Sequence, residues 1–431
     1  MTDSNTTSRR GFLTGAAGLL AATGVAQATP AEAKSKTGAP PAPPASAAKG
    51  TAEPFWGPHQ SGILTPAQTH TYFAAFDITA ERREDVIAML TRWTEATARM
   101  TAGRTARDLP ADLADTTADS ADVLELPPSR LTLTFGFGAT LFVKDGKDRF
   151  GLAAHRPEAL VDMPVFPGDQ LVEAMTGGDI SVQACADDPQ VAFHAVRQLA
   201  RIAYDTAAIR WVQSGFLGGF DAKETPRNLM GFKDGTGNPP VNDPEEMRKF
   251  VWVGTEGPDW MRGGSYLVVR RSRMALEHWD RMKVSFQEQT FGRRKYSGAP
   301  LTGHKETDAL DLDATDGDGN PVLPENSHVR LATAASNDGA KILRRSYSYN
   351  DGANVVAERW PPWRQGLEYD AGLIFVCYQK DPRTGFIPMF EKLSRFDMMN
   401  QFVTNVGSGL FACPEGVTKG GFIGQRLFEK A

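Results

Sequence analysis

The stretch Asp179-Ile-Ser-Val-Gln-Ala-Cys185, together with the 31 residues that follow it, decides the fold. Its β-branched and small residues predict a strand. From Pro189 to Thr206, apolar residues recur at helical spacing (Val191, Ala195, Leu199 and Ile202), which predicts an amphipathic helix. Ile209-Arg-Trp-Val-Gln-Ser-Gly-Phe216 then predicts a second strand, so this part of the chain has the order strand, helix, strand.

The same order is found elsewhere in the chain. In the first half it is predicted by a strand at Thr69–Asp77, a helix at Glu81–Met100 and a strand at Leu131–Phe135. The second half predicts strands at 264–271, 341–347, 372–378 and 409–413, with helices at 275–286 and 387–400. We therefore expect an α+β protein of two ferredoxin-like halves, each an antiparallel sheet with helices on one face.

The first residues predict a targeting segment. Ser8-Arg-Arg-Gly-Phe-Leu13 is a twin-arginine signature, a weakly apolar stretch follows to Ala26, and Ala26-Gln-Ala28 fits a cleavage site. A transmembrane anchor is disfavoured because the stretch is short, rich in Ala, Gly and Thr, and lacks a charged stop. The predicted organisation is a signal peptide at 1–28, a Pro/Ala-rich linker at 29–53, an N-terminal half at 54–220 and a C-terminal half at 221–431.

Composition indicates a soluble globular protein. Of the 431 residues, 41% are hydrophobic and 23% are charged, and the formal net charge is −5. No basic stripe with interleaved aromatic residues is present, so we expect no nucleic-acid partner. The three cysteines (Cys185, Cys377 and Cys413) lack metal-ligand spacing and fit buried thiols.

One acid stands in a glycine-rich run, Asn228-Leu-Met-Gly-Phe-Lys-Asp-Gly-Thr-Gly-Asn238. Glycines there let the backbone approach a flat ligand closely. By itself Asp234 could equally be a turn former or a helix cap. A nucleotide-binding loop is discounted because the Gly-x-x-x-x-Gly-Lys-Ser/Thr spacing is missing.

A second motif, Pro324-Glu-Asn-Ser-His-Val-Arg330, places an imidazole near a guanidinium, and Arg344 follows it. One His to ligate iron, one acid to move a proton and one Arg to stabilise charge on a departing oxygen are the parts that a haem peroxidase needs.

The two motifs resemble those of the dye-decolourising peroxidases. Phe232-Lys-Asp-Gly-Thr-Gly-Asn238 resembles the family's Gly-x-x-Asp-Gly signature, and Ser327–Arg330 resembles its haem-ligand segment. Ile342-Leu-Arg-Arg-Ser-Tyr-Ser-Tyr349 resembles the distal-arginine segment of the exported subgroup, which includes the deferrochelatase/peroxidase of bacterial iron uptake. The resemblance runs from about Thr69 to Phe428.

The resemblance implies haem b in the C-terminal half, with His328 as the axial ligand and Asp234 and Arg344 on the distal side. Strand alternation points Arg344 and Arg345 to opposite faces, so only one of them can serve, and Arg344 matches the family position. Asp397 is the candidate carboxylate partner for the second nitrogen of His328. The expected cofactor contacts are Gly235, Thr236, Gly237, His328, Arg330, Thr333, Ala334, Ala335 and Arg344.

The role of Arg330 is left open, and a calcium site in the acidic run that precedes it is set aside. Arg330 could bind a haem propionate or form an ordinary surface salt bridge. The acidic run Asp311–Asn320 looks like a calcium loop, but counting from Asp316 places Pro321 at position six and Ser327 at position twelve, so the EF-hand pattern fails and a solvated turn is expected.

The expected function is the reduction of hydrogen peroxide with oxidation of dyes or other bulky aromatic donors. Because such donors cannot enter a small distal pocket, surface Trp or Tyr residues would relay electrons, with Trp252, Trp260, Trp360 and Trp363 as candidates. The alternatives are release of iron from haem and a non-catalytic haem carrier, although a carrier would not need both Asp234 and Arg344.

We expect export by the twin-arginine translocation machinery to the periplasm or the medium, without a stable membrane anchor. Whether the protein forms a homodimer is left open.

Overall fold

The computed structural model describes residues 50–109, 118–218, 224–357 and 365–430. The predicted signal peptide and most of the predicted linker lie outside these ranges, as do Trp360, Trp363 and the boundary expected at 220/221. Among the described residues, no helix combines the length and the apolar character needed to cross a bilayer.

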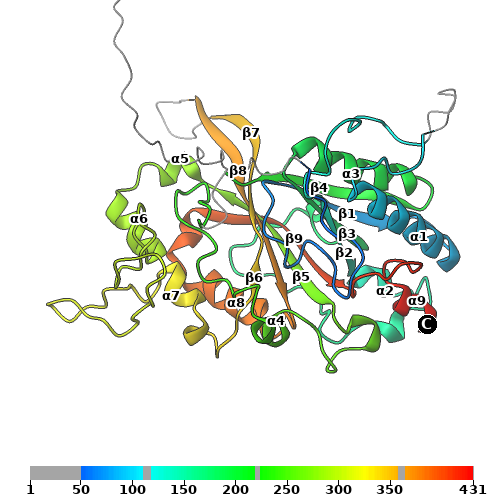
Figure 1. The fold of residues 1–431 in the computed structure, drawn as a ribbon. Coiled ribbons are helices and arrows are strands. Elements are labelled where there is room, and N and C mark those ends of the chain that lie inside the picture. Colours follow the sequence, from blue (N-terminus) through cyan, green and yellow to red (C-terminus); the bar gives the residue numbers. More distant parts are fainter. Residues whose placement is uncertain (1–49, 110–117, 219–223, 358–364, 431) are drawn as a thin grey trace, which may run out of the picture. The chain divides into compact units, whose positions relative to one another are not determined.

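The first half folds around four antiparallel strands in the spatial order β2-β3-β1-β4. Helices α1 and α3 pack together against β1 and β3 (Figure 1). The elements are β1 (His70–Ile78), α1 (Arg83–Met100), β2 (Thr132–Gly138), α2 (Ala139–Phe142), β3 (Ile180–Ala186), α3 (Pro189–Ile202) and β4 (Ala207–Phe216). This is the ferredoxin-like order expected from the sequence.

Helix α3 begins at Pro189, as predicted, because two features favour that start. The Asp188 carboxylate accepts hydrogen bonds from the amides of Gln190 and Val191, and proline is favoured at the first helical position. The helix ends at Ile202 instead of continuing to Thr206, since residues 203–206 form the turn that leads into β4.

The second half repeats the plan with the spatial order β9-β5-β8-β7, also antiparallel. Its strands are β5 (Ser265–Met274), β6 (Leu343–Arg344), β7 (Tyr347–Ala357), β8 (Gln365–Gln379) and β9 (Val403–Cys413). Its helices are α4 (Pro244–Phe250), α5 (Leu276–Trp279), α6 (Val284–Phe291), α7 (His328–Ala332), α8 (Phe386–Phe396) and α9 (Gln425–Lys430). Helices α5 to α8 lie on the other side of the strands from α1 and α3 (Figure 1).

The strands β8 and β9 begin earlier than the strands expected at 372–378 and 409–413, and three further predicted elements are interrupted or end early. The helix expected at 275–286 is two short helices, and the Gln287 amide donates to the carbonyl oxygens of Trp279 (2.9 Å) and Met282 (3.4 Å), which satisfies the end of α5. The strand expected at 341–347 is interrupted after Arg344. The helix expected at 387–400 ends before Asp397, which has an extended backbone and caps a short 3-10 helix at Met398–Gln401.

The two sheets are joined edge to edge, which the sequence did not predict. Phe216 of β4 pairs with Ser348 of β7, and Phe137 and Gly138 of β2 pair with residues of β9. Because β5 also pairs with β8, the strands close into a ring. Side chains from strands of both halves form one core cluster, including Phe73, Ala75, Cys185, Trp211, Leu267, Val269, Tyr347, Ile374, Val376, Tyr378, Phe411 and Cys413. All three cysteines are buried free thiols, as expected.

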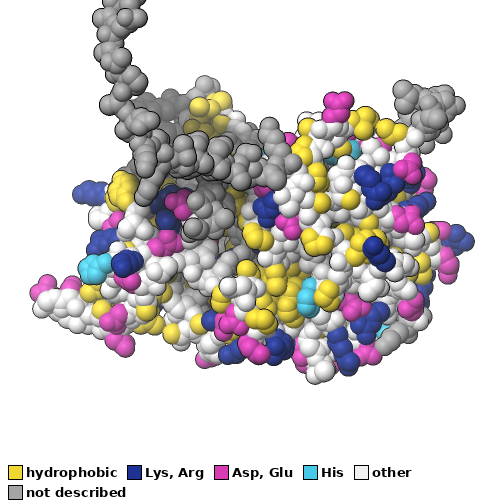
Figure 2. Space-filling model, in the orientation of Figure 1, with side chains coloured by type: hydrophobic (Ala, Val, Ile, Leu, Met, Phe, Trp, Pro, Cys, Tyr) yellow, Lys and Arg dark blue, Asp and Glu magenta, His cyan; other side chains and the backbone are white. Residues whose placement is uncertain are grey.

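On the face shown in Figure 2, Lys and Arg side chains are intermingled with Asp and Glu side chains. The charge of this face is therefore not gathered into one basic band of the kind that follows a nucleic-acid backbone.

A buried ionic cluster joins α3 to the segment before β2. The Nδ1 atom of His194 lies 2.8 Å from Asp122 Oδ1, and its Nε2 atom lies 3.6 Å from Asp119 Oδ2. Burial alone would lower the pKa of His194, but the two carboxylates raise it overall. Stability from this cluster is therefore present below the unfolded pKa of about 6.5 and is lost as the pH rises through the folded pKa.

We expect His194→Gln to lower the free energy of unfolding by about 2 kcal/mol at pH 6, because it removes one partner from buried carboxylates. The difference from the unmodified protein should shrink as the pH rises from about 6 to about 9. Denaturant unfolding across this range measures it, with the exposed His278→Gln as control. A difference that stays constant with pH would contradict this account.

Candidate active site

His328 is the first residue of α7, and its side chain contacts a carboxylate. Its Nδ1 atom lies 2.6 Å from Asp397 Oδ2, and the side chains of the two residues are 29% and 3% exposed. Because Nδ1 faces an acceptor, it carries the proton, and Nε2 is left with the lone pair that ligates a metal. The predicted partnership of His328 with Asp397 is confirmed.

The break after α8 explains why Asp397 can reach His328. Asp397 Oδ1 accepts a hydrogen bond from Met399 N at 2.8 Å, so one carboxylate oxygen caps the 3-10 helix while the other meets the imidazole. Met398 N donates to Asn326 O at 3.1 Å, which ties this segment to the chain just before His328. A continuous helix through residue 400 could not have given Asp397 this extended backbone.

Asp234 and Arg344 form the second part of the site. Arg344 Nη1 lies 3.0 Å from Asp234 Oδ1, and their side chains are 26% and 22% exposed. The backbone of Asp234 donates to Pro226 O at 2.8 Å, and the next residue, Gly235, has a φ of +127°, which favours glycine at this bend. The structure thus brings together two residues that come from separate motifs.

Arg344 is fixed on both sides of its backbone. It pairs with Cys377 of β8, and the Asn238 side chain accepts from Arg344 N (3.1 Å) and donates to Arg344 O (2.8 Å). The neighbouring Arg345 is buried elsewhere, with its guanidinium on Thr65 O and the Gln68 side chain. Of the two arginines, only Arg344 faces Asp234, in agreement with the alternation argument, and it is the one expected from the family position.

The two parts of the site act on each other electrostatically. Burial alone would lower the pKa of His328, but Asp397 raises it overall; Arg344 lowers the same pKa and Asp234 raises it. The two charges of the Asp234–Arg344 pair therefore act on the pKa of His328 in opposite directions, although the pair belongs to different elements. Phe291 of α6 lies edge-on to the His328 ring, with the ring centroids 6.0 Å apart.

The other predicted cofactor contacts belong to the segments that carry or follow these groups. Gly235, Thr236 and Gly237 continue the Asp234 loop, and an added Cβ on Gly237 would be 3.9 Å from Arg344 Nη2. Beyond α7, Thr333 caps the 3-10 helix Ala334–Ser336 by accepting from Ser336 N at 3.1 Å. That helix contains the other two predicted contacts, Ala334 and Ala335.

The Arg330 side chain contacts the backbone of the acidic run and of the segment that follows it. Its Nη1 atom donates to Leu312 O at 2.7 Å and to Leu323 O at 3.1 Å. Both partners of this nitrogen are therefore backbone carbonyls, and neither a propionate nor a carboxylate side chain. Within the loop, Asp316 Oδ1 accepts from the amides of Asp318 and Asn320, each at 2.9 Å, as in a self-closed polar turn.

Two residues that support the site were missed from the sequence. Asn238 stood inside the quoted motif, but its contact with the Arg344 backbone spans 106 residues. Glu306, which contacts Lys233 and Thr236 beside Asp234, belongs to no motif. Neither contact leaves a local signal, because both join segments that are distant along the chain.

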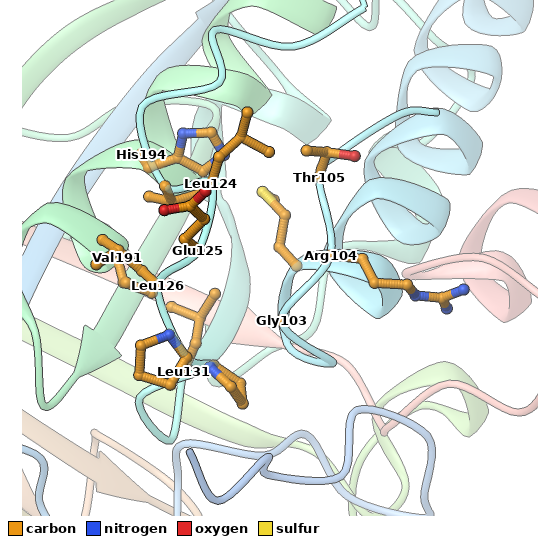
Figure 3. A pocket seen from close by; sticks show the side chains of 13 residues that line it. Gly103, Arg104, Thr105, Leu124, Glu125, Leu126, Leu131, Val191 and His194 are labelled. Carbon is orange, nitrogen blue, oxygen red and sulfur yellow. The ribbon is translucent and has the colours of Figure 1, made fainter. Parts of the chain in front are cut away.

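A separate cavity of about 70 Å³ lies in the N-terminal half (Figure 3). Apolar side chains such as Leu124, Leu126, Leu131 and Val191 line most of it, together with His194. The residues predicted for the active site do not line this cavity.

Comparison with known proteins gives matches along most of the chain. The model of the N-terminal region of the Dyp-type peroxidases matches residues 60–217, and the model of their C-terminal region matches residues 225–418. A dye-decolorizing peroxidase of Thermobifida fusca is 39% identical over 385 residues, covering 86% of this chain and 84% of that protein. A deferrochelatase of Escherichia coli O157:H7 is 35% identical over 421 residues, covering 96% and 95%.

Solved structures agree with the sequence matches. Ferric DtpA from Streptomyces lividans superposes with a TM-score of 0.80 at 40% identity, covering 90% of this chain and all of that chain. A DyP-type peroxidase from Cellulomonas bogoriensis gives a TM-score of 0.76 at 36% identity, covering 88% and 99%.

These matches define the chain as a peroxidase, an oxidoreductase of a kind that uses haem. More particularly, the chain belongs to the Dyp-type peroxidase family, and its two ferredoxin-like halves form the α+β fold of that family.

Proposed function

We propose that this protein reduces hydrogen peroxide with haem b bound through Nε2 of His328, and that Asp234 and Arg344 act on the peroxide. The observation that carries the proposal is the 3.0 Å contact between Arg344 and Asp234, close enough to His328 to change its pKa. Paired opposite charges are suited to handling a proton and a developing negative charge together.

The residues present fit a haem group. His328 has one ring nitrogen held by Asp397, which fixes the ring and raises the basicity of the other nitrogen. A basic imidazole is the proximal donor found in haem peroxidases. Bound haem would supply the iron at which peroxide is reduced, and the protein supplies the groups that follow.

Asp234 would manage the proton. Its carboxylate would accept the proton from the peroxide oxygen nearer the iron and return it to the outer oxygen, which leaves as water. Arg344 would stabilise the negative charge that develops on the departing oxygen. Both roles require the two side chains to keep their positions, which the Asn238 contacts with the Arg344 backbone support.

Aromatic donors would complete the reaction by returning electrons. Of the candidate relays that the structure describes, Trp260 is 3% exposed and packs in the core. Trp252 is partly buried and stacks on His59, with the ring centroids 3.9 Å apart. Trp252 is therefore the better of these two candidates for contact with a bulky donor.

Release of iron from haem is the alternative suggested by the relatives named deferrochelatase. The names of the relatives do not decide between the two, because their identities are similar, 39% and 35%. A non-catalytic haem carrier is the other alternative, and peroxide reduction is favoured over it because a carrier does not need a preformed Asp234–Arg344 pair, whereas peroxide chemistry uses it.

We also propose that the protein is exported folded, to the periplasm or the medium, by the twin-arginine machinery. The support is the Ser8–Leu13 signature followed by a weakly apolar stretch. Export in the folded state suits an enzyme that receives a bulky cofactor before it crosses the membrane.

Asp397→Asn should weaken haem binding by roughly tenfold and raise the reduction potential of the iron, because His328 loses an anionic partner and becomes a weaker donor. Haem titration and spectroelectrochemistry measure the two effects. Glu391→Gln, an exposed change on α8, the helix that ends just before Asp397, is the control. An unchanged potential in Asp397→Asn would show that the carboxylate does not tune the ligand.

Asp234→Asn and Arg344→Leu should each keep haem but slow the reaction with peroxide by roughly 10²- to 10⁴-fold. Stopped-flow recording of the haem absorbance after mixing with peroxide gives the rate constants. The matched controls are Asp85→Asn and Arg82→Leu, which alter an exposed Asp–Arg pair in the first half. Rates like those of the unmodified protein in both site variants would refute the assigned roles.

Replacing both Arg9 and Arg10 with Lys should leave the precursor in the cytoplasm, since the arginine pair is recognised by a receptor. Fractionation and N-terminal sequencing test this, with a mature start expected after about Ala28. The same double change at Arg82 and Arg83, another adjacent pair, is the control. Undiminished export of the first variant would overturn the proposed route.

A further inference from the structure

We propose that Glu306 is a positioning residue for Asp234. Its carboxylate contacts the loop that carries Asp234 on both sides of that residue and balances the charge of Lys233, so that the Asp234 carboxylate stays with Arg344. The inference deepens the proposed function and rests on the role given there to Asp234.

The Glu306 carboxylate contacts the Asp234 loop at two residues. Glu306 Oε2 lies 2.5 Å from Lys233 Nζ, and Glu306 Oε1 accepts a hydrogen bond from Thr236 Oγ1 at 3.0 Å. Lys233 is the residue before Asp234, and Thr236 is two residues after it. One carboxylate, from a segment 70 residues away, therefore bridges the loop that carries Asp234.

Glu306 is itself held in place. Arg293 Nη1 donates to Glu306 O at 2.9 Å and to Gly298 O at 2.7 Å. The aliphatic part of Lys233 packs on Gly298, where an added Cβ would lie only 2.8 Å from Lys233 Cδ, and Gly298 has a φ of +75°. The backbone of Glu306 is thus bound to the segment around Gly298, which packs on Lys233 of the Asp234 loop.

The carboxylate carries its charge at neutral pH. Burial alone would raise the pKa of Glu306, but hydrogen bonds from Lys233, Thr225 and Thr236 lower it overall. The Lys233 and Glu306 side chains are 20% and 18% exposed, so solvent screens the pair only in part.

Charge balance explains why the pair matters to Asp234. The charged groups that these contacts place around Asp234 include Arg344, which touches it, Lys233, Glu306 and Arg293. Burial and the charge of Arg344 lower the pKa of Arg293. Arg227, which forms a β-bridge with Lys233, and Lys295, beside Gly231, are further cations of the same segment. With Glu306 present, Lys233 has its own partner. Without that negative charge, the Lys233 ammonium would compete with Arg344 for the neighbouring carboxylate.

Two single substitutions make the prediction directional. Glu306→Gln keeps the size of the side chain but leaves Lys233 uncompensated, whereas Lys233→Met leaves Glu306 uncompensated. If Asp234 accepts a proton from peroxide, the acid limb of the pH–rate profile should move to lower pH in Glu306→Gln and to higher pH in Lys233→Met, each by about 0.5 pH unit or more. The double variant should return the limb toward its original pH.

The experiment is stopped-flow measurement of the peroxide reaction from about pH 4 to about pH 8 on haem-loaded protein. In Glu306→Gln, the rate constant at the plateau should also fall by about tenfold, because Asp234 is drawn away from Arg344. Haem content and melting temperature, measured on the same samples, report any loss of folding. Glu415→Gln, which alters a half-exposed ion pair with Arg426, is the matched control.

The outcomes separate the two claims. Opposite shifts of the acid limb support the inference, since a purely structural ion pair would move both variants in the same way. Shifts in one direction, or none, together with a slow Asp234→Asn variant, would refute the positioning role alone. If Asp234→Asn reacted as fast as the unmodified protein, the proposed function and the inference would be refuted together.

Discussion

The contact between Arg344 and Asp234 is the interaction on which the rest of the site depends. It joins segments 110 residues apart, and each partner is held by further groups. Arg344 is fixed by strand pairing with Cys377 and by the Asn238 side chain. Solvent still reaches both side chains, which are 26% and 22% exposed, and weakens the attraction between their charges. These supports therefore help to keep the two side chains together.

The two faces of the site are built from different elements. His328 belongs to α7 and Asp397 follows the end of α8, while Asp234 and Arg344 belong to a loop and to β6. This division means that the proposed iron ligand and the groups proposed to handle peroxide can be altered separately. The joining of the sheets contributes to the arrangement, because the pairing of Phe216 with Ser348 connects the first half to the strand that follows Arg344.

Much of the fold could be predicted from local pattern. The spacing in Pro189–Ile202 and the strands around it predicted the ferredoxin-like order, because hydrophobic periodicity reports which face of each element is buried. The closure of the two sheets could not be predicted, since edge pairing leaves no periodic signal. The single helix expected at 387–400 was wrong because hydrogen bonds to Asp397 outweigh helix propensity at that residue. The same break gives His328 its partner, which the sequence offered only as a candidate. Glu306 could not be predicted, because its role depends on charges placed next to it by the fold.

The central claim is that His328 and the Asp234–Arg344 pair lie on opposite sides of one haem. A crystal structure of the haem-loaded protein, with anomalous scattering recorded at the iron edge, tests it most directly. We expect an iron peak bonded to Nε2 of His328, with Nδ1 on Asp397 and with Asp234 and Arg344 across the haem plane. Iron ligated by another residue, or an Asp234–Arg344 pair on the same side of the haem as His328, would contradict it.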